Sequence, residues 1–148
     1  MSTSADETAD LPRAEFDIGA PLPDGVTVLE ASAGTGKTYA IAALAVRYIA
    51  EGIPLERLLV VTFTRMATGE LRDRLRTRMI GAHAGLQRFL AEGSAPDDDL
   101  LAALTTGGRA QVESRCRQLG RAPAAPEDLS AVRHDAWPGH RLYVRELK

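Results

Sequence analysis

Residues 30–38 decide the fold, and they read Glu30-Ala31-Ser32-Ala33-Gly34-Thr35-Gly36-Lys37-Thr38. A short apolar run, Val26 to Leu29, comes immediately before them, and a long helix-compatible stretch begins at Lys37. A glycine-rich loop that ends in lysine and threonine, between a strand and a helix, is typical of a phosphate-binding P-loop. The sequence therefore predicts a nucleotide site at this loop, with ATP and Mg²⁺ as its ligands.

The residue types of the loop suit a triphosphate, which is a concentrated anion. Gly34 and Gly36 tolerate backbone angles that turn successive N–H groups inward, and the following helix contributes the positive end of its dipole. The ammonium of Lys37 would contact the β- and γ-phosphates, and the hydroxyl of Thr38 would ligate Mg²⁺. We expect Lys37 and Thr38 to be the catalytic residues of the loop, with Thr38 as the metal ligand. The ATP-binding residues are predicted to be Ala31, Ser32, Ala33, Gly34, Thr35, Gly36, Lys37 and Thr38.

One position departs from the strict P-loop pattern. That pattern has a glycine five residues before Gly36, where this chain has Ala31. A glycine-rich turn with an unrelated lysine is therefore the alternative interpretation. The strand-like run before the loop and the helical stretch after it favour phosphate binding, because the motif requires that context.

The composition of the whole chain limits the other possibilities. Its 148 residues correspond to one domain, 45% of them are hydrophobic, and the formal net charge is −2. The single cysteine, Cys116, offers neither a disulfide nor a metal cluster and indicates a reducing compartment. The first ten residues are polar, and the longest apolar stretch, residues 41–49, is shorter than a membrane span and contains Arg47. We therefore expect a cytoplasmic protein with no membrane partner, and no metal site at His134 and His140, which lack a third ligand.

The first part of the chain predicts one strand–helix–strand unit. The helix from Lys37 has apolar residues on one stripe and should end at Gly52, where glycine can adopt the left-handed backbone. Residues 58–63 are a second short, continuous apolar run with β-branched members, which is typical of a buried strand. Together these elements predict an α/β fold, a partial P-loop domain with parallel strands and flanking helices.

The second part of the chain is expected to be helical and then irregular. A helix begins at about Met66 with Thr64 as its N-cap, although Gly81 and Gly85 weaken it. A short apolar helix follows, with Asp99 as its expected cap. We predict a disordered N-terminus over residues 1–15, a folded domain over residues 16–119 and a disordered or irregular C-terminal tail over residues 120–148.

The helix after Thr64 is rich in basic residues. Four arginines recur at alternate positions: Arg72, Arg74, Arg76 and Arg78. Because they spread around the helix, part of the set must face water. A solvated helix face and a phosphate-contacting surface are both open as interpretations.

Two motifs therefore stand in order along the chain. The first is the loop of residues 31–38, and the second is Val60-Val61-Thr62-Phe63-Thr64 followed by residues 67–72, ATGELR. Together they resemble motifs I and Ia of superfamily 1 DNA helicases of the UvrD type. Residues 29–38 are most similar to the RecB-like beta subunit of exodeoxyribonuclease V, a family in which alanine at position 31 is normal. The resemblance covers residues 16–79 and implies a RecA-like domain.

The resemblance implies further roles outside the loop. Thr62, Phe63 and Thr64 would line a track for single-stranded DNA, where hydroxyls position phosphates and an aromatic ring stacks on a base. A buried position at the end of a strand is the alternative for Phe63. Residues 16–18 would lie near the adenine, although the glutamine typical of many of these helicases is absent there. Arg65 stands where many relatives carry an acidic residue or asparagine.

The resemblance also indicates what this sequence does not contain. Hydrolysis needs a carboxylate that orders Mg²⁺ and water and an arginine that meets the developing charge. The family supplies them from a later Asp-Glu motif and from a second RecA-like domain; the aspartates at residues 97–99 follow no apolar strand and do not fit that motif. We therefore expect an ATP-binding N-terminal fragment of a helicase–nuclease that acts in double-strand-break repair and recombination. The fragment alone should be catalytically incompetent. Whether the chain itself is an enzyme is left open at this point. Its implied partners are single-stranded DNA and other subunits of an exodeoxyribonuclease V complex.

Two alternatives from other functional classes stay open. One is a small stand-alone P-loop nucleotide-binding protein or kinase, although residues 62–64 are of the helicase type rather than the start of a kinase lid. The other is a non-functional truncated product, because two parallel strands do not make a full sheet. A frameshift upstream of His134 is the corresponding hypothesis for the tail.

Overall fold

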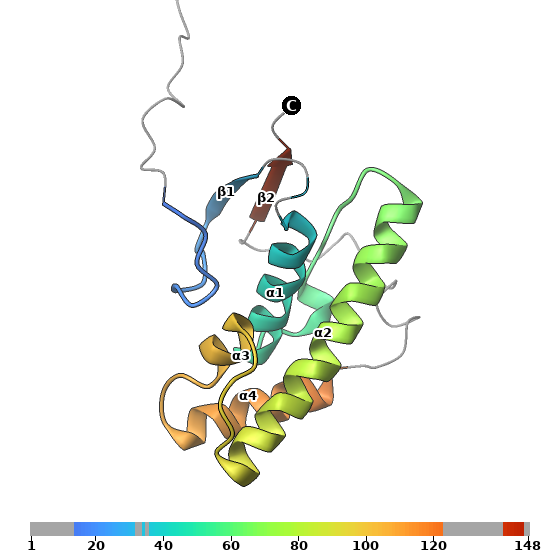
Figure 1. The fold of residues 1–148 in the computed structure, drawn as a ribbon. Helices are drawn as coiled ribbons and strands as arrows, with labels where there is room; N and C mark the ends of the chain where they lie inside the picture. The colour runs from blue at the N-terminus through green and yellow to red at the C-terminus, as the bar shows by residue number, and fades with distance from the viewer. Residues whose placement is uncertain (1–13, 32–33, 35, 123–140, 147–148) are drawn as a thin grey trace, which may run out of the picture.

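The computed structural model describes residues 14–31, 34, 36–122 and 141–146 (Figure 1). Most of these residues are helical: α1 spans Lys37–Ala50, α2 Arg65–Glu92, α3 Asp99–Leu104 and α4 Arg109–Arg121, with a 3₁₀ turn, η1, at Leu55–Arg57. The same ranges contain two short strands, β1 at Val26–Ala31 and β2 at Arg141–Glu146. In Figure 1 the strands and the start of α1 lie at the upper end of the molecule, and α3 and α4 lie at the lower end.

The end of α1 is built around a glycine, as the sequence predicts. Gly52 has a φ of +97°, in the left-handed region that glycine adopts without strain. Its N–H donates to the carbonyl of Ile49 at 3.0 Å, and the N–H of Ile53 donates to the carbonyl of Tyr48 at 3.0 Å. This pair of hydrogen bonds is the Schellman pattern, which satisfies the last carbonyls of a helix, and Pro54 directly follows it.

α2 runs without interruption for 28 residues. Thr64 caps it as predicted, because its hydroxyl accepts a hydrogen bond from the N–H of Ala67 at 3.0 Å. Gly81 and Gly85 do not break the helix. Gly85 is buried, and a Cβ at this position would lie 2.6 Å from a side-chain carbon of Leu101 in α3. The missing side chain lets α2 and α3 approach closely, which is a tertiary reason for a glycine inside a helix.

The cap of α3 lies one residue before the expected position. Asp98, rather than Asp99, is the N-cap, and its Oδ1 accepts a hydrogen bond from the N–H of Leu101 at 2.8 Å. Asp99 is the first helical residue, where its negative charge suits the positive end of the helix dipole. The sequence thus indicated the helix start correctly but assigned the cap to the wrong aspartate of the run.

One hydrophobic core joins the four helices. α1 is the central element, and it lies between the strands and α2 in Figure 1. Each helix contributes to the largest fully buried side chains, which are Val46, Leu86, Leu100, Leu104 and Val112. Because burying an aliphatic side chain of this size stabilises a fold by about 1.5–3 kcal/mol, these five side chains make the helices stabilise one another, and Leu29 of β1 packs against the same core.

Two polar side chains of α1 fix the segment that leads into β1. Arg47 is buried and donates from Nη1 to the carbonyls of Ile18 at 2.5 Å and Ala20 at 2.6 Å. The hydroxyl of Tyr48 donates to the carbonyl of Pro23 at 2.9 Å. Burial lowers the pKa of the Arg47 guanidinium and raises the pKa of the Tyr48 phenol. These contacts hold the leading segment against α1 and so help to position β1.

The strand pairing differs from the predicted one. β1 pairs in parallel with β2, with Val26 opposite Arg141 and Ala31 opposite Glu146. Residues 58–63 form no strand, so the prediction of a second strand there is wrong. Their β-branched composition favours an extended chain, but a strand also needs a hydrogen-bonding neighbour, and the neighbour of β1 is β2. The predicted α/β arrangement is therefore limited to one parallel pair beside a helical body.

The predicted tail contains regular structure where it is described. We expected irregular chain from residue 120 onward, whereas α4 continues to Arg121 and β2 occupies Arg141–Glu146. Nearly all of the expected disordered N-terminus lies outside the described residues, as do His134 and His140. None of the helices in the described ranges is both long and apolar enough to span a bilayer.

Candidate nucleotide and nucleic-acid site

The predicted phosphate-binding loop lies between a strand and a helix. β1 ends at Ala31 and α1 begins at Lys37, so the context that the motif requires is present. Gly34 has a φ of +77° and Gly36 a φ of +90°. Both angles lie in the left-handed region, which explains why the turn uses glycine at these two positions. Three members of the predicted set lie outside the described residues: Ser32, Ala33 and Thr35.

The start of α1 suits an anion. Its N-cap, Gly36, has no side chain that could cap the helix, and the first turn contains no acidic residue. The first N–H groups of a helix lack intrahelical acceptors and carry the positive end of its dipole. Lys37 and Thr38 are the first two helical residues, and both are half-buried. The arrangement thus brings backbone donors, an ammonium and a hydroxyl to one place, as phosphate binding requires.

Three side chains from different elements meet beside the first turn of α1: Tyr39, Arg78 and Asp98. The guanidinium carbon of Arg78 lies 4.0 Å from the centroid of the Tyr39 ring, a cation–π distance. Nη1 of Arg78 also contacts Oδ2 of Asp98 at 2.7 Å, and the other oxygen of Asp98 caps α3. The group connects the first turn of α1 to α2 and α3. Sequence reasoning missed it, because no spacing rule relates three residues so far apart in the chain.

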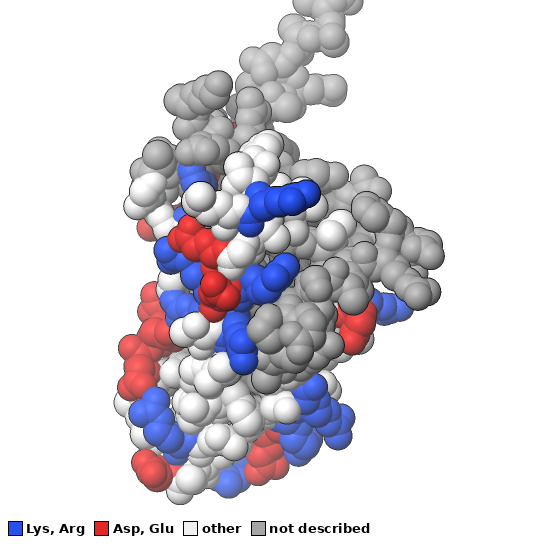
Figure 2. Space-filling view, turned by 90° about the vertical axis from the view of Figure 1, so that its right-hand side faces the viewer, with Lys and Arg blue, Asp and Glu red and all other residues white. Residues whose placement is uncertain are grey.

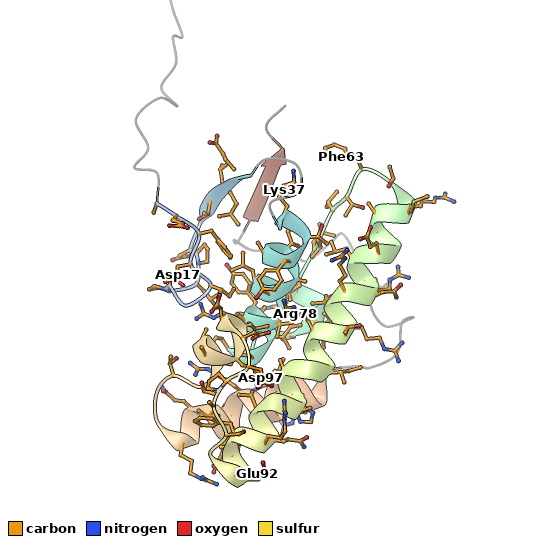
Figure 3. All side chains as sticks on the ribbon, viewed as in Figure 1. Asp17, Lys37, Phe63, Arg78, Glu92 and Asp97 are labelled. Carbon is orange, nitrogen blue, oxygen red and sulfur yellow. The ribbon has the colours of Figure 1, made fainter. Side chains whose placement is uncertain are left out.

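The aspartates at residues 97–99 have structural partners. Asp97 forms an ion pair with Arg88 at 2.8 Å, and Asp98 pairs with Arg78. Figure 3 shows Asp97 toward the lower part of the molecule, away from Lys37 at the upper end of α1. In this structure the two carboxylates pair with α2 rather than face the nucleotide loop.

The second motif is an exposed turn into α2. Phe63 is fully exposed, at 104% of its reference area, so the alternative of a buried strand-end ring is wrong. The hydroxyl of Thr68 donates to the carbonyl of Thr64 at 3.0 Å and lies 2.5 Å from the hydroxyl of Thr62. The hydroxyl of Thr64 caps α2, but a hydroxyl can accept one hydrogen bond and donate another. The turn is thus ordered by its threonines, while its aromatic ring faces solvent.

The two motifs lie at the same end of the molecule. Figure 3 shows Lys37 at the start of α1 and Phe63 beyond it, on the chain that leads into α2. A cavity of about 70 Å³ lies between α1, this chain and α2, and its lining includes Thr62, Thr68 and Arg72. The second motif therefore adjoins the helix that follows the nucleotide loop, even though residues 58–63 form no strand.

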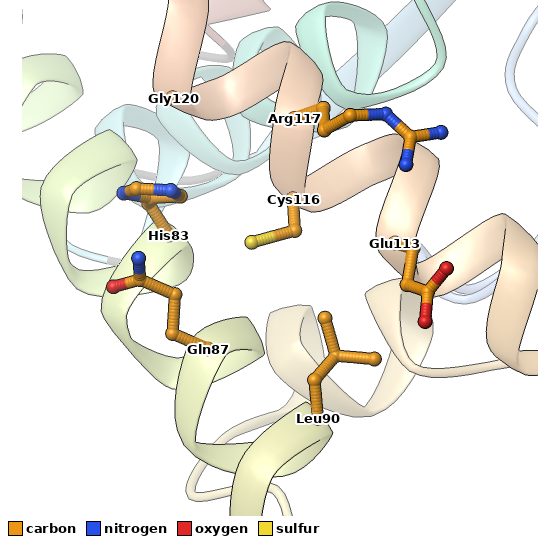
Figure 4. Close-up of a pocket in the computed structure, with 7 residues that line it drawn as sticks. All are labelled: His83, Gln87, Leu90, Glu113, Cys116, Arg117 and Gly120. Atoms are coloured by element: carbon orange, nitrogen blue, oxygen red, sulfur yellow. The ribbon is translucent and has the colours of Figure 1, made fainter.

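A larger hollow, of about 330 Å³, lies between α2 and α4, away from both motifs. His83 and Gln87 from α2 and Cys116 from α4 face it (Figure 4). Burial raises the pKa of the Cys116 thiol, which disfavours the nucleophilic thiolate near neutral pH. Among the residues that the structure describes, no group of three or more His, Cys, Asp or Glu side chains is arranged to hold a metal ion. Cys116 therefore has the properties of an ordinary packing residue.

Comparison with known proteins gives the family. Residues 15–113 match the UvrD/REP helicase N-terminal domain. The chain belongs to this helicase family. The RecBCD enzyme subunit RecB of Mycobacterium tuberculosis (strain ATCC 25618 / H37Rv) is 46% identical over 109 residues, which are 69% of this chain and 10% of the relative. The corresponding protein of Mycolicibacterium smegmatis is 50% identical over 74 residues, 48% of this chain and 7% of the relative.

A relative from a more distant organism is similar over a shorter stretch. The RecBCD enzyme subunit RecB of Escherichia coli (strain K12) is 47% identical over 64 residues, 37% of this chain and 5% of the relative. The resemblance to UvrD-type and RecB-like helicases that the two motifs indicate is thereby confirmed. The matched part of this chain spans about a tenth or less of the length of these relatives.

Proposed function

We propose that this chain is the ATP-binding part of a UvrD/RecB-like ATP-dependent DNA helicase, and that residues 31–38 bind the triphosphate. The observation that carries the proposal is the strand–loop–helix unit of β1 and α1, in which two glycines have positive φ and Lys37 and Thr38 open the helix. Membership of the helicase family supports it, because the matched region includes the whole loop.

The proposed roles follow from the chemistry of each group. Backbone N–H groups of the loop and of the first turn of α1 donate to the phosphates, and the Lys37 ammonium neutralises the β- and γ-phosphates. The Thr38 hydroxyl is a hard oxygen donor that would suit Mg²⁺. The metal ion would supply Lewis-acid chemistry there by withdrawing charge from the phosphate oxygens.

The DNA part of the proposal rests on the exposed turn of residues 62–64. A solvent-facing aromatic ring offers a stacking surface to any base, and the neighbouring hydroxyls can donate to phosphates. Since relatives carry the name RecBCD enzyme subunit RecB, we extend the proposal to a longer protein that acts on DNA within such an enzyme, in break repair and recombination.

We further propose that the 148-residue chain alone binds ATP without turning it over. Hydrolysis needs a carboxylate at the metal and an arginine at the transferred phosphate. The carboxylates of Asp97 and Asp98 are engaged with arginines of α2, and the later family motifs are absent from this sequence.

The test is a titration of Mg·ATP into the full chain and into Lys37→Ala. A hydrogen bond to a charged group contributes about 1.5–3 kcal/mol, so the affinity of the variant should fall about ten- to hundredfold. Arg121→Ala is the matched control, because it removes an exposed cation at the far end of the molecule. Thr38→Ala should weaken binding chiefly when Mg²⁺ is present. An affinity for ATP that Lys37→Ala leaves unchanged contradicts the proposal.

A further inference from the structure

The arginines of α2 fall into two sets that differ in their partners. Three of the six are held by carboxylates: Arg74 by Glu70, Arg78 by Asp98 and Arg88 by Asp97, at 2.7–2.8 Å. The other three, Arg65, Arg72 and Arg76, form no ion pair or hydrogen bond with any residue in the described part of the chain. Guanidinium groups without carboxylate partners are available to another anion.

The three arginines without partners share one side of the helix. At 3.6 residues per turn, Arg65, Arg72 and Arg76 fall within a sector of about 40°, whereas Arg74 and Arg88 lie about 140–180° away from Arg65. The sector runs for about 16 Å along the helix axis. Glu70 is bound to Arg74, and Asp73 lies about 80° from Arg65 round the helix. We call this set, Arg65, Arg72 and Arg76, the arginine stripe.

The arginine stripe begins at the exposed aromatic turn. Arg65 is the first residue of α2, two residues after Phe63. Arg72 lines the cavity that Thr62 and Thr68 also line, so the stripe faces the same side as the second motif. Arg72 and Arg76 are half-buried, and a long basic side chain can bury its stem while its charged end reaches solvent. Figure 2 faces the α2 side of the molecule and shows basic side chains spread down it, with acidic side chains to their left and others at the bottom and the right.

We propose that the arginine stripe binds the phosphate backbone of single-stranded DNA and extends the DNA path from Phe63 along α2. The inference rests on the proposed function, in which single-stranded DNA binds at residues 62–64. It adds Arg65, Arg72 and Arg76 to the residues that contact the strand. Stacking on Phe63 would orient a base, and the guanidiniums would then hold successive phosphates of the same strand. Contacts of this kind are independent of sequence and sensitive to salt.

The test measures binding of a fluorescent oligothymidylate to the full chain by anisotropy, over a series of salt concentrations. Arg72→Gln/Arg76→Gln should lose affinity by roughly fivefold for each contact at about 0.1 M salt, with a slope of log K against log salt that is shallower by about 0.7 per contact. Arg74→Gln/Arg88→Gln is the matched control, since it removes the same charge from the same helix on the other side. Its binding should stay within about twofold of the unmodified chain, because Arg74 and Arg88 lie on the other side of the helix and salt screens exposed charges at that distance.

Three other results would overturn the inference, and they show whether the proposed DNA turn fails with it. Equal losses in the two double variants would mean a general effect of charge. If Arg72→Gln/Arg76→Gln binds the oligonucleotide as tightly as the unmodified chain while Phe63→Ala loses affinity, the arginine stripe is only a solvated face. The proposed DNA contact at residues 62–64 would then be retained. Failure of the unmodified chain to bind the oligonucleotide would remove both the stripe and the DNA turn. Should far-UV circular dichroism show that a double variant is misfolded, Arg65→Gln replaces it, because Arg65 is exposed and makes no contact in the described chain.

Discussion

The helical body and the end of the molecule that carries both motifs differ in how far their apolar side chains are covered. In the helical body, Leu86 and Leu104 are 0% exposed. At the motif end, Val61, Phe63 and Met66 are 79%, 104% and 84% exposed. The first region is packed like a protein core, whereas the second presents large apolar groups to solvent.

The helical body thus covers its own apolar side chains, whereas the motif end exposes apolar side chains that another molecule could cover. Consecutive exposed apolar residues are unusual on a soluble surface and mark places that bind another molecule or another part of a protein. At the motif end Leu59, Val60 and Val61 are consecutive and exposed, Phe63 and Met66 follow, and Val60 lines the cavity shared with α1 and α2. If stability resides in the helical body and binding in the motif end, substitutions in the two regions should have different effects.

The largest expected effect is on stability and comes from the helical body. Leu86→Ala removes a fully buried side chain and leaves a cavity among the helices, so the free energy of unfolding should fall by about 2–5 kcal/mol. Urea unfolding followed by far-UV circular dichroism measures it. Val61→Ala is the matched truncation at the motif end and should stay within about 0.5 kcal/mol of the unmodified chain. If both variants lose a comparable amount of unfolding free energy, the motif end is packed as tightly as the helices, and the proposed difference between the two regions is wrong.

The next prediction concerns two glycines of α2, at which an alanine substitution should change the free energy of unfolding in opposite directions. Gly85→Ala places a methyl group 2.6 Å from Leu101, and overpacking of this kind costs about 1–3 kcal/mol, of which improved helix propensity offsets up to about 1 kcal/mol. Gly81→Ala meets no atom within 4 Å and should stabilise the chain by about 0.5–1 kcal/mol. Thermal and urea unfolding of the pair give the answer. If both variants gain stability, the close approach of α2 and α3 is not needed by the fold.

Local signals in the sequence predicted the elements of the helical body well. The N-cap at Thr64 and the left-handed Gly52 are set by a few neighbouring residues, and both are confirmed. Gly85 was expected only to weaken α2, because its contact with Leu101 in another helix leaves no local signal. The strand predicted at residues 58–63 is absent for a different reason. A β-branched run indicates extended chain, but strand pairing depends on a distant partner, and β2 comes from the far end of the sequence.

The candidate site shows the same division between local and distant information. The order of strand, loop and helix around residues 31–38 could be predicted, since the glycine spacing and the flanking runs are adjacent in the chain. The exposure of Phe63 could not, because burial depends on what packs above it. The contacts of Tyr39 with Arg78, and of Arg78 with Asp98, join three elements and leave no pattern in the sequence. Two of the three pairings of α2 arginines, Arg78 with Asp98 and Arg88 with Asp97, likewise depend on aspartates that lie beyond the helix.

An effect of about 1 kcal/mol on stability is expected at Thr64, where the helical body and the motif end meet. Thr64→Ala removes the cap and should cost about 1 kcal/mol, whereas Thr64→Ser retains an acceptor for the N–H of Ala67 and should cost little. Thr64→Asp separates the two proposed roles, because a carboxylate caps a helix as well as threonine does but repels a phosphate. We therefore expect the aspartate variant to unfold at the same urea concentration as the unmodified chain and to bind oligothymidylate more weakly. If it loses stability and keeps its DNA affinity, Thr64 belongs to the helical body alone, and the DNA track does not extend to the first turn of α2.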